Sequence, residues 1–131
     1  MSEHILVVAL GGRVVGIDAR NGQELWRNEM ELGGISFVAL ALNSNSVFTS
    51  ASAKKLFCIA RQTGKTVWSA STSGMGRATL LCDEEKVIVS KGGHIDCFTC
   101  FGELLWTKDM RKVGKGVAAL ALHEQVVQAD G

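Results

Sequence analysis

One short stretch occurs three times in this 131-residue chain, and it restricts the folds that the chain can adopt. Each copy consists of a turn that ends in glycine, three further residues and a tryptophan. The copies are Asn21–Trp26, Thr63–Trp68 and Phe101–Trp106, so the three tryptophans of the chain lie 42 and 38 residues apart. A period of about 40 residues is typical of propeller blades and of helical arrays. The chain is therefore predicted to consist of repeated units.

Short apolar and β-branched segments alternate with turns along the chain, and this pattern predicts strands. Helical arrays of the same period require longer amphipathic stretches, which the sequence lacks. Short strands joined by turns of a few residues form an antiparallel meander. The sequence therefore predicts an all-β, propeller-type fold with four-stranded antiparallel blades, about three of them in one chain. The expected strands are Ile5–Leu10, Arg13–Ala19, Gln23–Asn28, Ile35–Leu42, Val47–Thr49, Lys55–Ala60, Thr66–Ser69, Arg77–Cys82, Lys86–Ser90, His94–Thr99, Glu103–Thr107, Val117–Leu122 and Gln125–Ala129.

The repeats are expected to form one domain, residues 1–131. They cover roughly 5–45, 46–85 and 86–124, and 125–131 is an extra copy of the strand with which the chain begins. Propellers normally have about four to eight blades, so three blades leave two apolar faces exposed. We expect two copies of the chain to associate head to tail into a six-bladed ring. A truncated propeller that packs in another way is the structural alternative.

Composition and charge exclude several classes of partner. Fourteen basic and thirteen acidic residues give a formal net charge of +1, which favours neither nucleic acid nor an anionic membrane surface. The longest apolar stretch, Ile5–Leu10, is too short to span a bilayer. The N-terminus lacks the basic region and long apolar segment of a secretory signal. We therefore expect a cytoplasmic protein, or a periplasmic one if a signal has been removed.

The stretch from Gly16 to Trp26 resembles the tryptophan-docking motif of the PQQ-repeat propellers, which include pyrroloquinoline quinone dehydrogenases and a related outer-membrane assembly lipoprotein. The pattern of that family is A-x-D-x-x-x-G-x-x-x-W. The chain matches it with Asp18, Gly22 and Trp26, and Gly16 replaces the alanine. The later copies retain the last two positions of the motif, which are Gly64 and Trp68 in the second copy and Gly102 and Trp106 in the third. WD40 and Kelch repeats match less well, because no Trp-Asp pair and no tyrosine occurs.

The resemblance implies that each tryptophan packs on the next blade, with a glycine at the turn where positive φ is needed. The membrane dehydrogenases of the family carry a disulfide between adjacent cysteines beside the quinone, and this chain has no such pair. We therefore expect no cofactor, no metal and no catalytic residues. The resemblance favours a non-catalytic scaffold that binds another protein, while a small-molecule or quinone-binding module is the alternative.

Cysteine and histidine residues offer few candidate ligands. Cys97 and Cys100 form a C-x-x-C, which is typical of zinc or redox sites. No second pair has the required spacing, and residues three apart in a strand point to opposite faces, so packing is the better interpretation. The remaining cysteines, Cys58 and Cys82, lie in apolar runs that suit reduced, buried thiols. The histidines fall at a terminus or in turns, where we expect them to be exposed: His4, His94 and His123.

The loops that follow the three tryptophans differ in charge. The first contains Glu29 and Glu31, and the second, 69–76, is uncharged. In a ring of blades all three loops lie on one face. The third loop is a candidate site for an anionic partner or for the acidic loop of another copy, and a solvated surface loop is the alternative. Its basic residues are Lys108, Arg111, Lys112 and Lys115.

Overall fold

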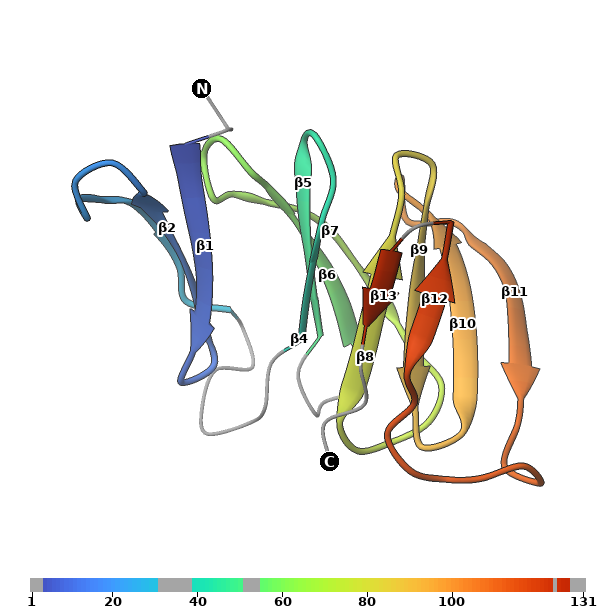
Figure 1. The fold of residues 1–131 in the computed structure, drawn as a ribbon. Helices are drawn as coiled ribbons and strands as arrows, with labels where there is room; N and C mark the ends of the chain where they lie inside the picture. The colour runs from blue at the N-terminus through green and yellow to red at the C-terminus, as the bar shows by residue number, and fades with distance from the viewer. Residues whose placement is uncertain (1–3, 31–38, 51–54, 124, 128–131) are drawn as a thin grey trace.

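A computed structural model of the chain describes residues 4–30, 39–50, 55–123 and 125–127. Thirteen strands make up its secondary structure (Figure 1). No helix long and apolar enough to cross a bilayer occurs in these residues. The strands are β1 (Ile5–Leu10), β2 (Arg13–Asp18), β3 (Glu24–Asn28), β4 (Ala39–Leu42), β5 (Ser46–Ser50), β6 (Lys55–Ala60), β7 (Thr66–Ser71), β8 (Ala78–Cys82), β9 (Lys86–Lys91), β10 (His94–Thr99), β11 (Leu104–Asp109), β12 (Leu120–Leu122) and β13 (Gln125–Val127).

The strands form three antiparallel sheets and a final hairpin, each with neighbours in sequence order. The sheets are β1-β2-β3, β4-β5-β6-β7 and β8-β9-β10-β11, and the hairpin is β12-β13. This arrangement confirms the predicted all-β fold of successive antiparallel blades. The first sheet has three strands because β1 corresponds to β5 and β9, the second strands of the other two sheets. The parts of the predicted strands at 35–38 and 128–129 lie outside the described residues.

The same irregularity occurs in all three sheets, on the strand that carries the tryptophan. The pairing register shifts by one residue immediately before the tryptophan, which marks a β-bulge. The unpaired residues of the three bulges are Leu25, Val67 and Leu105. Because the bulge recurs, each tryptophan faces an equivalent residue across the strand pair. These cross-strand partners are Gly16 for Trp26, Cys58 for Trp68 and Cys97 for Trp106.

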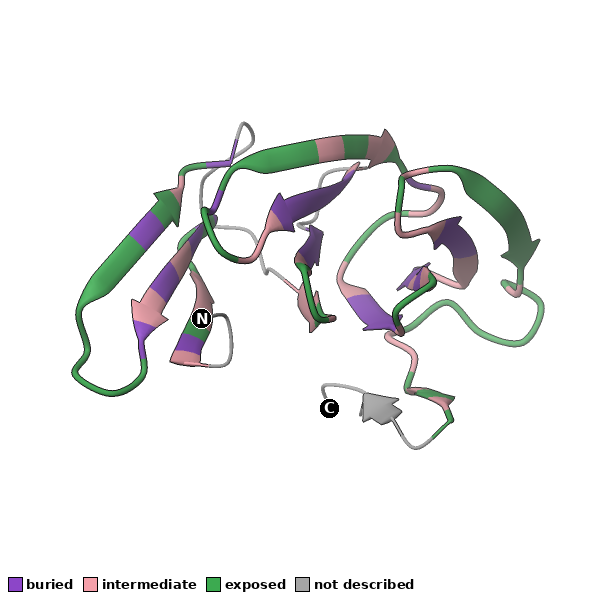
Figure 2. Ribbon diagram, turned by 90° about the horizontal axis from the view of Figure 1, so that it is seen from above, coloured by how far each residue is buried: buried purple, intermediate pink, exposed green. Residues whose placement is uncertain are grey.

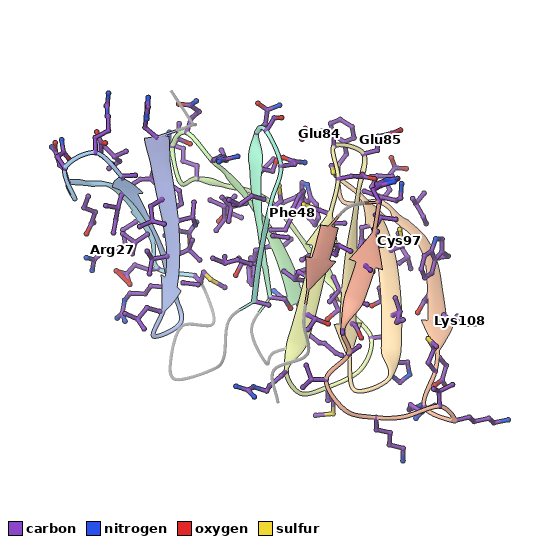
Figure 3. The ribbon with its side chains drawn as sticks, in the orientation of Figure 1. Arg27, Phe48, Glu84, Glu85, Cys97 and Lys108 are labelled. Atoms are coloured by element: carbon purple, nitrogen blue, oxygen red, sulfur yellow. The ribbon has the colours of Figure 1, made fainter. Side chains whose placement is uncertain are left out.

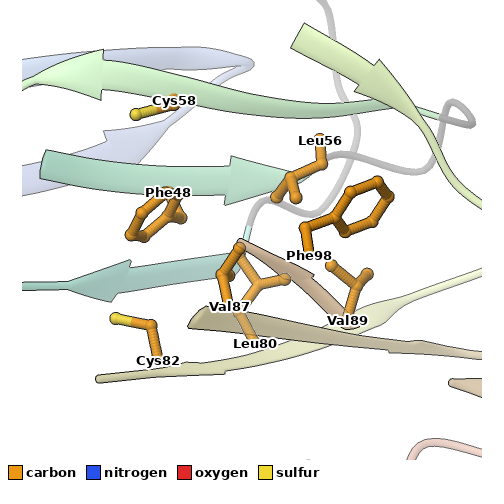
Figure 4. Close-up of a cluster of buried hydrophobic side chains, with 8 residues drawn as sticks. All are labelled: Phe48, Leu56, Cys58, Leu80, Cys82, Val87, Val89 and Phe98. Atoms are coloured by element: carbon orange, nitrogen blue, oxygen red, sulfur yellow. The ribbon is translucent and has the colours of Figure 1, made fainter. Parts of the chain in front are cut away.

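Two apolar clusters lie between successive sheets (Figure 2). The first joins β1–β3 to the second sheet and includes Val14, Trp26 and Ile59. The second joins the second and third sheets and is shown in Figure 4. Its buried residues are Phe48, Leu56, Cys58, Leu80, Cys82, Val87, Val89 and Phe98. These side chains are buried only where two sheets meet, so a single blade on its own would leave them exposed to water.

The two ends of the strands carry different connections. The turns that precede the tryptophan strands, between β2 and β3, β6 and β7, and β10 and β11, lie at the upper end in Figure 1. The loops that follow β7 and β11 lie at the lower end, together with the Gly92–Gly93 turn between β9 and β10. The second and third of the loops expected on one face of a ring therefore share one end of the sheets, whereas the end of the first loop, with Glu31, lies outside the described residues.

Candidate functional site

Trp26 of the first sheet packs on the turn of the second sheet. Its side chain is almost completely buried, and its indole Nε1–H donates a hydrogen bond of 3.0 Å to the carbonyl oxygen of Arg61. The ring lies directly over Gly64, so that a Cβ at that position would overlap the ring carbons. Gly64 also has a φ of 77°, which strains any L-residue. The glycine therefore meets two requirements, a positive φ and a close approach of the ring.

Trp68 repeats this arrangement between the second and third sheets. Its Nε1–H donates a hydrogen bond of 2.9 Å to the carbonyl oxygen of Cys100. A Cβ at Gly102 would lie 3.0 Å from the ring, and φ there is 95°. The indole also lies between two phenylalanines, Phe48 and Phe98, with ring centroids 6.0 and 6.5 Å away. Two equivalent pairs of a tryptophan and a glycine therefore join successive sheets.

The third tryptophan and the first glycine of the motif have no such contact. Trp106 remains 47% exposed, and all six residues of β11 are exposed. Nothing lies within 4 Å of a Cβ built at Gly22, although its φ of 79° is that of the other two glycines. Within the described residues, the first glycine of the series therefore has no tryptophan packed on it, and the last tryptophan has no glycine turn beneath it.

Asp18 shapes the turn that contains Gly22. Its carboxylate accepts a hydrogen bond from the backbone N–H of Arg20 at 2.9 Å and two from the Arg20 guanidinium at 3.0 Å. These bonds lower the pKa of Asp18 to about 2. Thr99 occupies the equivalent place in the third sheet, where its hydroxyl accepts from two backbone N–H groups of the turn. The residue at this motif position therefore accepts hydrogen bonds from the turn in both sheets, through a carboxylate in the first and a hydroxyl in the third.

The two cysteines of the C-x-x-C lie in different surroundings. Cys97 is fully buried on β10 opposite Trp106 (Figure 3). The Cys100 thiol lies beside Asn43 Nδ2 and the Asp83 carbonyl oxygen at the upper end of the sheets. Burial raises the pKa of Cys82 to about 12 and that of Cys100 to about 11. Within the described residues, no group of three or more His, Cys, Asp or Glu side chains could hold a metal ion.

Two of the three histidines are only partly exposed, in contrast to the expectation for turn residues. His4 and His94 are half-buried, and His123 is exposed with its Nε2 3.3 Å from an Asp83 carboxylate oxygen. His94 Nε2 lies 4.0 Å from an Asp109 carboxylate oxygen. Such contacts with residues distant in the sequence are not revealed by the position of a histidine in a turn.

The four basic residues of the third loop separate into two groups. Lys108 lies on β11 (Figure 3), whereas Arg111, Lys112 and Lys115 lie in the loop below it. The Arg111 guanidinium forms two hydrogen bonds with Asp109, of 2.9 and 2.6 Å, which hold the pKa of that carboxyl well below its usual range. Four basic residues and one acidic residue leave the segment 108–115 with three positive charges in excess.

A hollow lies between this loop and the loop of the preceding sheet. It has a volume of about 540 Å³ and lies at the end of the sheets that carries the Gly92–Gly93 turn. Arg111 and Lys115 form one side of it, and Met75, which is 69% exposed, belongs to the other. Lys112 faces an adjoining hollow with Asp109, Arg111 and Lys115. The structure thus brings three of the four predicted basic residues together beside an exposed apolar side chain.

The sequence profile of a PQQ-repeat family, described as outer membrane protein assembly factor BamB, matches residues 10–131. The chain belongs to this family. The match covers all three tryptophan–glycine motifs, in keeping with the PQQ-repeat resemblance of the sequence. No curated protein is significantly similar in sequence to this PQQ-repeat chain.

Solved structures confirm the propeller-type fold of the PQQ-repeat chain. The crystal structure of BamB from Moraxella catarrhalis has a TM-score of 0.65 and 20% identity over 80% of this chain and 33% of that one. Quinohemoprotein alcohol dehydrogenase from Comamonas testosteroni has a TM-score of 0.63 and 22% identity over 80% and 19%. The computationally designed Ika4 protein has a TM-score of 0.77 and 22% identity over 96% and 79%. The chain therefore spans a third or less of the two natural proteins.

A lysine that the sequence pattern does not mark as buried lies between the second and third sheets. Lys91 is 1% exposed, and its Nζ donates a hydrogen bond of 3.3 Å to the Thr72 hydroxyl. Burial lowers its pKa from 10.5 to about 8, while the nearby Asp96 carboxylate opposes the shift. Asp96 itself is buried and accepts hydrogen bonds of 2.6 Å from the Ser73 backbone N–H and the Thr107 hydroxyl. Polar contacts therefore complete the lower end of this sheet interface.

The lowered pKa of Lys91 predicts a pH-dependent stability. The folded chain releases the Lys91 proton near pH 8, whereas the unfolded chain retains it up to about pH 10.5. The Lys91 contribution to the free energy of unfolding must therefore rise between these values. We expect the difference in stability between Lys91→Met and the unchanged chain to shift by about 1–3 kcal/mol from pH 7 to pH 10, in favour of the unchanged chain. Chemical denaturation at several pH values measures this shift, and exposed Lys65→Met is the control that should not show it. A pH-independent difference for Lys91→Met would contradict the prediction.

Proposed function

We propose that this PQQ-repeat chain is a non-catalytic scaffold that binds an acidic segment of another protein. The observation that carries the proposal is the hollow between Met75 and the basic residues Arg111 and Lys115. An exposed apolar side chain beside an excess of positive charge suits a segment with both apolar and acidic side chains. The loops at this end of the sheets present the surface, and the blades act as its support.

The charges of the hollow favour an extended anionic partner. Arg111 is held in place by its two hydrogen bonds with Asp109, so its position costs little further entropy on binding. Lys112 and Lys115 are exposed and project from the same loop. Met75 offers the apolar contact of the hollow. A partner that places carboxylates near the lysines and an apolar group against Met75 would meet both requirements.

The family description supports a protein as the partner. The matching family is described as an outer membrane protein assembly factor, a function that concerns other proteins. Since the chain covers only a third of the BamB structure, that function is not transferred to it as a whole. The family description supports only the inference that the partner is a protein.

A quinone-binding module is the alternative, because one similar structure is a quinohemoprotein dehydrogenase. The described residues do not fit a calcium–quinone site, since they bring no three His, Cys, Asp or Glu side chains together and no two cysteines are adjacent in the sequence. A titration with pyrroloquinoline quinone and calcium, followed by absorbance and melting temperature, tests this alternative. A saturable shift in either would favour it over the scaffold.

Fluorescence anisotropy with a short labelled peptide tests the scaffold proposal. The probe carries two leucines flanked by glutamates, and its counterpart has lysines in place of the glutamates. We expect the acidic peptide to bind and its affinity to fall as salt is raised. Replacing Lys115 by glutamate should weaken binding about five- to tenfold, which corresponds to roughly 1 kcal/mol.

Lys65→Glu is the matched control, because Lys65 is exposed on the turn between β6 and β7 at the opposite end of the sheets. The same change of charge there should leave the affinity within about twofold. Equal binding of the acidic and basic peptides would show that the hollow does not select acidic segments. An equal loss in Lys65→Glu and Lys115→Glu would show that only net charge matters, and would also overturn the proposal.

A further inference from the structure

We propose that Trp106 of one copy of this chain packs on the Gly22 turn of a second copy, in the contact that Trp26 and Trp68 make within the chain. Trp106 is the exposed tryptophan at one end of the series of sheets, and Gly22 is the uncovered glycine at the other. Each copy therefore carries both halves of one contact. Two copies arranged head to tail satisfy both ends and close into a ring of six sheets.

The Gly22 turn already has the conformation of the turns that hold a tryptophan. In all three turns the glycine N–H donates to the carbonyl oxygen of the residue at the Asp18 position of the motif. The three φ angles agree to within about 20° and are all positive. The turn therefore needs no rearrangement to accept an indole ring. The bonds are Gly22 to Asp18 at 2.8 Å, Gly64 to Ala60 at 2.8 Å and Gly102 to Thr99 at 3.0 Å.

The acceptor for the indole N–H is also present. In the two internal contacts, the indole donates to the carbonyl oxygen of the residue that follows the Asp18 position, which is Arg61 or Cys100. The corresponding residue of the first turn is Ala19, which is exposed. We therefore expect the Trp106 Nε1–H of one copy to donate to the Ala19 carbonyl oxygen of the other.

Apolar side chains accompany the two halves of the contact. Ile59 and Phe98, which pack against Trp26 and Trp68, occupy one position next to the bulge. Ile17 occupies that position in the first sheet and is only half-buried. On the same sheet Leu6 is 52% exposed and Leu10 is 74% exposed. The first sheet thus offers an apolar surface of the kind that the other two bury.

The far side of the third sheet offers the complementary surface. Ile95, which occupies the position of the buried Leu56, is half-buried and lines a cavity of about 190 Å³. Val117 and Ala118 line the same cavity on the segment that leads to β12. Ile88, in the position of Phe48, is also half-buried. A second copy that covers this side would complete a cluster of the kind seen between the second and third sheets (Figure 4).

The hairpin β12-β13 determines how the second copy enters. β12 corresponds to β4 and β8, the first strands of their sheets, and β13 corresponds to β1. Within the described residues, β1 pairs only with β2 and lacks a first-strand neighbour. The β1 of the second copy and the β13 of the first therefore compete for the same edge of β12. We infer that β1 replaces β13 when the ring closes, so that each outer blade consists of β12 from one copy and β1–β3 from the other.

Light scattering coupled to size-exclusion chromatography tests the proposal, over a wide range of concentrations. The chain has a mass of 14.0 kDa, and we expect a species of twice this mass. Gly22→Ala places a methyl group where the Trp106 ring must lie, and Trp106→Ala removes the ring. Each should raise the dissociation constant of the dimer at least about tenfold. Deleting residues 125–131 removes β13 and should lower that constant.

Two matched variants serve as controls for these changes. Gly76 has a φ of 96° and, like Gly22, nothing within 4 Å of an added Cβ, so Gly76→Ala introduces comparable backbone strain away from the contact. Val67 is 61% exposed on β7, and Val67→Ala removes apolar surface from a sheet that is already packed on both sides. Both should remain dimeric. A monomer at all concentrations would overturn the proposal, and so would a dimer that Gly22→Ala and Trp106→Ala leave unchanged.

Discussion

Replacement of Trp26 by alanine should lower the free energy of unfolding by about 3–5 kcal/mol, whereas the same replacement at Trp106 should change the stability of the monomer by less than about 1 kcal/mol. The two residues occupy the same motif position, so the difference between the two losses of free energy measures the contribution of the contact with the next sheet. Trp26 is 8% exposed and packs with Val14, Val47 and Ile59. Its removal leaves a cavity in this cluster and an unpaired carbonyl oxygen at Arg61.

Urea denaturation, followed by circular dichroism, measures both changes at concentrations where association is negligible. Trp26→Phe separates the two parts of the effect, because it retains an aromatic ring and loses the hydrogen bond to Arg61. We expect its cost to lie between those of Trp26→Ala and Trp106→Ala. Similar losses for Trp26→Ala and Trp106→Ala would mean that the contact with the next sheet contributes little to stability, and that the tryptophan does not hold successive sheets together.

The repeat made much of the fold predictable from the sequence. Three of the expected strands, Ile5–Leu10, Lys55–Ala60 and His94–Thr99, have the bounds seen in the structure. Most other strands differ by one or two residues at an end, because end residues pair according to the neighbouring strand and not according to their own β-propensity. The turns themselves were predictable, since glycines with positive φ mark several of them and positive φ is a local requirement that the sequence displays directly.

The polar part of the sheet interface could not be predicted in the same way. Lys91 and Asp96 lie on strands where an alternating pattern gives no sign of burial for a charged residue. They are buried because Thr72 and Ser73, from the loop of the preceding sheet, supply hydrogen bonds to them. Such contacts join residues about 20 apart in the sequence, and they depend on how two sheets pack. Only the three-dimensional arrangement shows them.

The candidate site was predicted as a charged loop but not as a surface. The sequence placed Lys108, Arg111, Lys112 and Lys115 in one group, and the structure separates Lys108 from the other three. Met75 gave no signal, because it comes from the loop of another sheet, and the hollow exists only where the two loops approach each other. The contact between them depends on the angle between successive sheets, which no local pattern encodes.

Replacement of Gly64 by alanine should lower the free energy of unfolding by about 2–4 kcal/mol. Two effects combine at this position. An alanine at a φ of 77° is strained by about 1 kcal/mol relative to glycine. Its methyl group would also overlap the ring of Trp26, which is held by its own cluster and by the hydrogen bond to Arg61. The ring cannot move away without losing these contacts, so we expect overpacking to add about 1–3 kcal/mol.

Gly22→Ala supplies the reference for the backbone effect alone, because Gly22 has a φ of 79° and nothing lies within 4 Å of its added Cβ. In the monomer we expect it to cost about 1 kcal/mol. Thermal and urea denaturation of the two variants in parallel therefore measure the steric part of the Gly64 effect as a difference. In the double variant Gly64→Ala/Trp26→Ala the ring is absent, so the steric part of the Gly64 effect should disappear. The double variant should therefore lose less free energy of unfolding than the sum of the losses of the two single variants. Equal costs for Gly64→Ala and Gly22→Ala would show that the glycine serves the turn alone, and that the tryptophan does not require it.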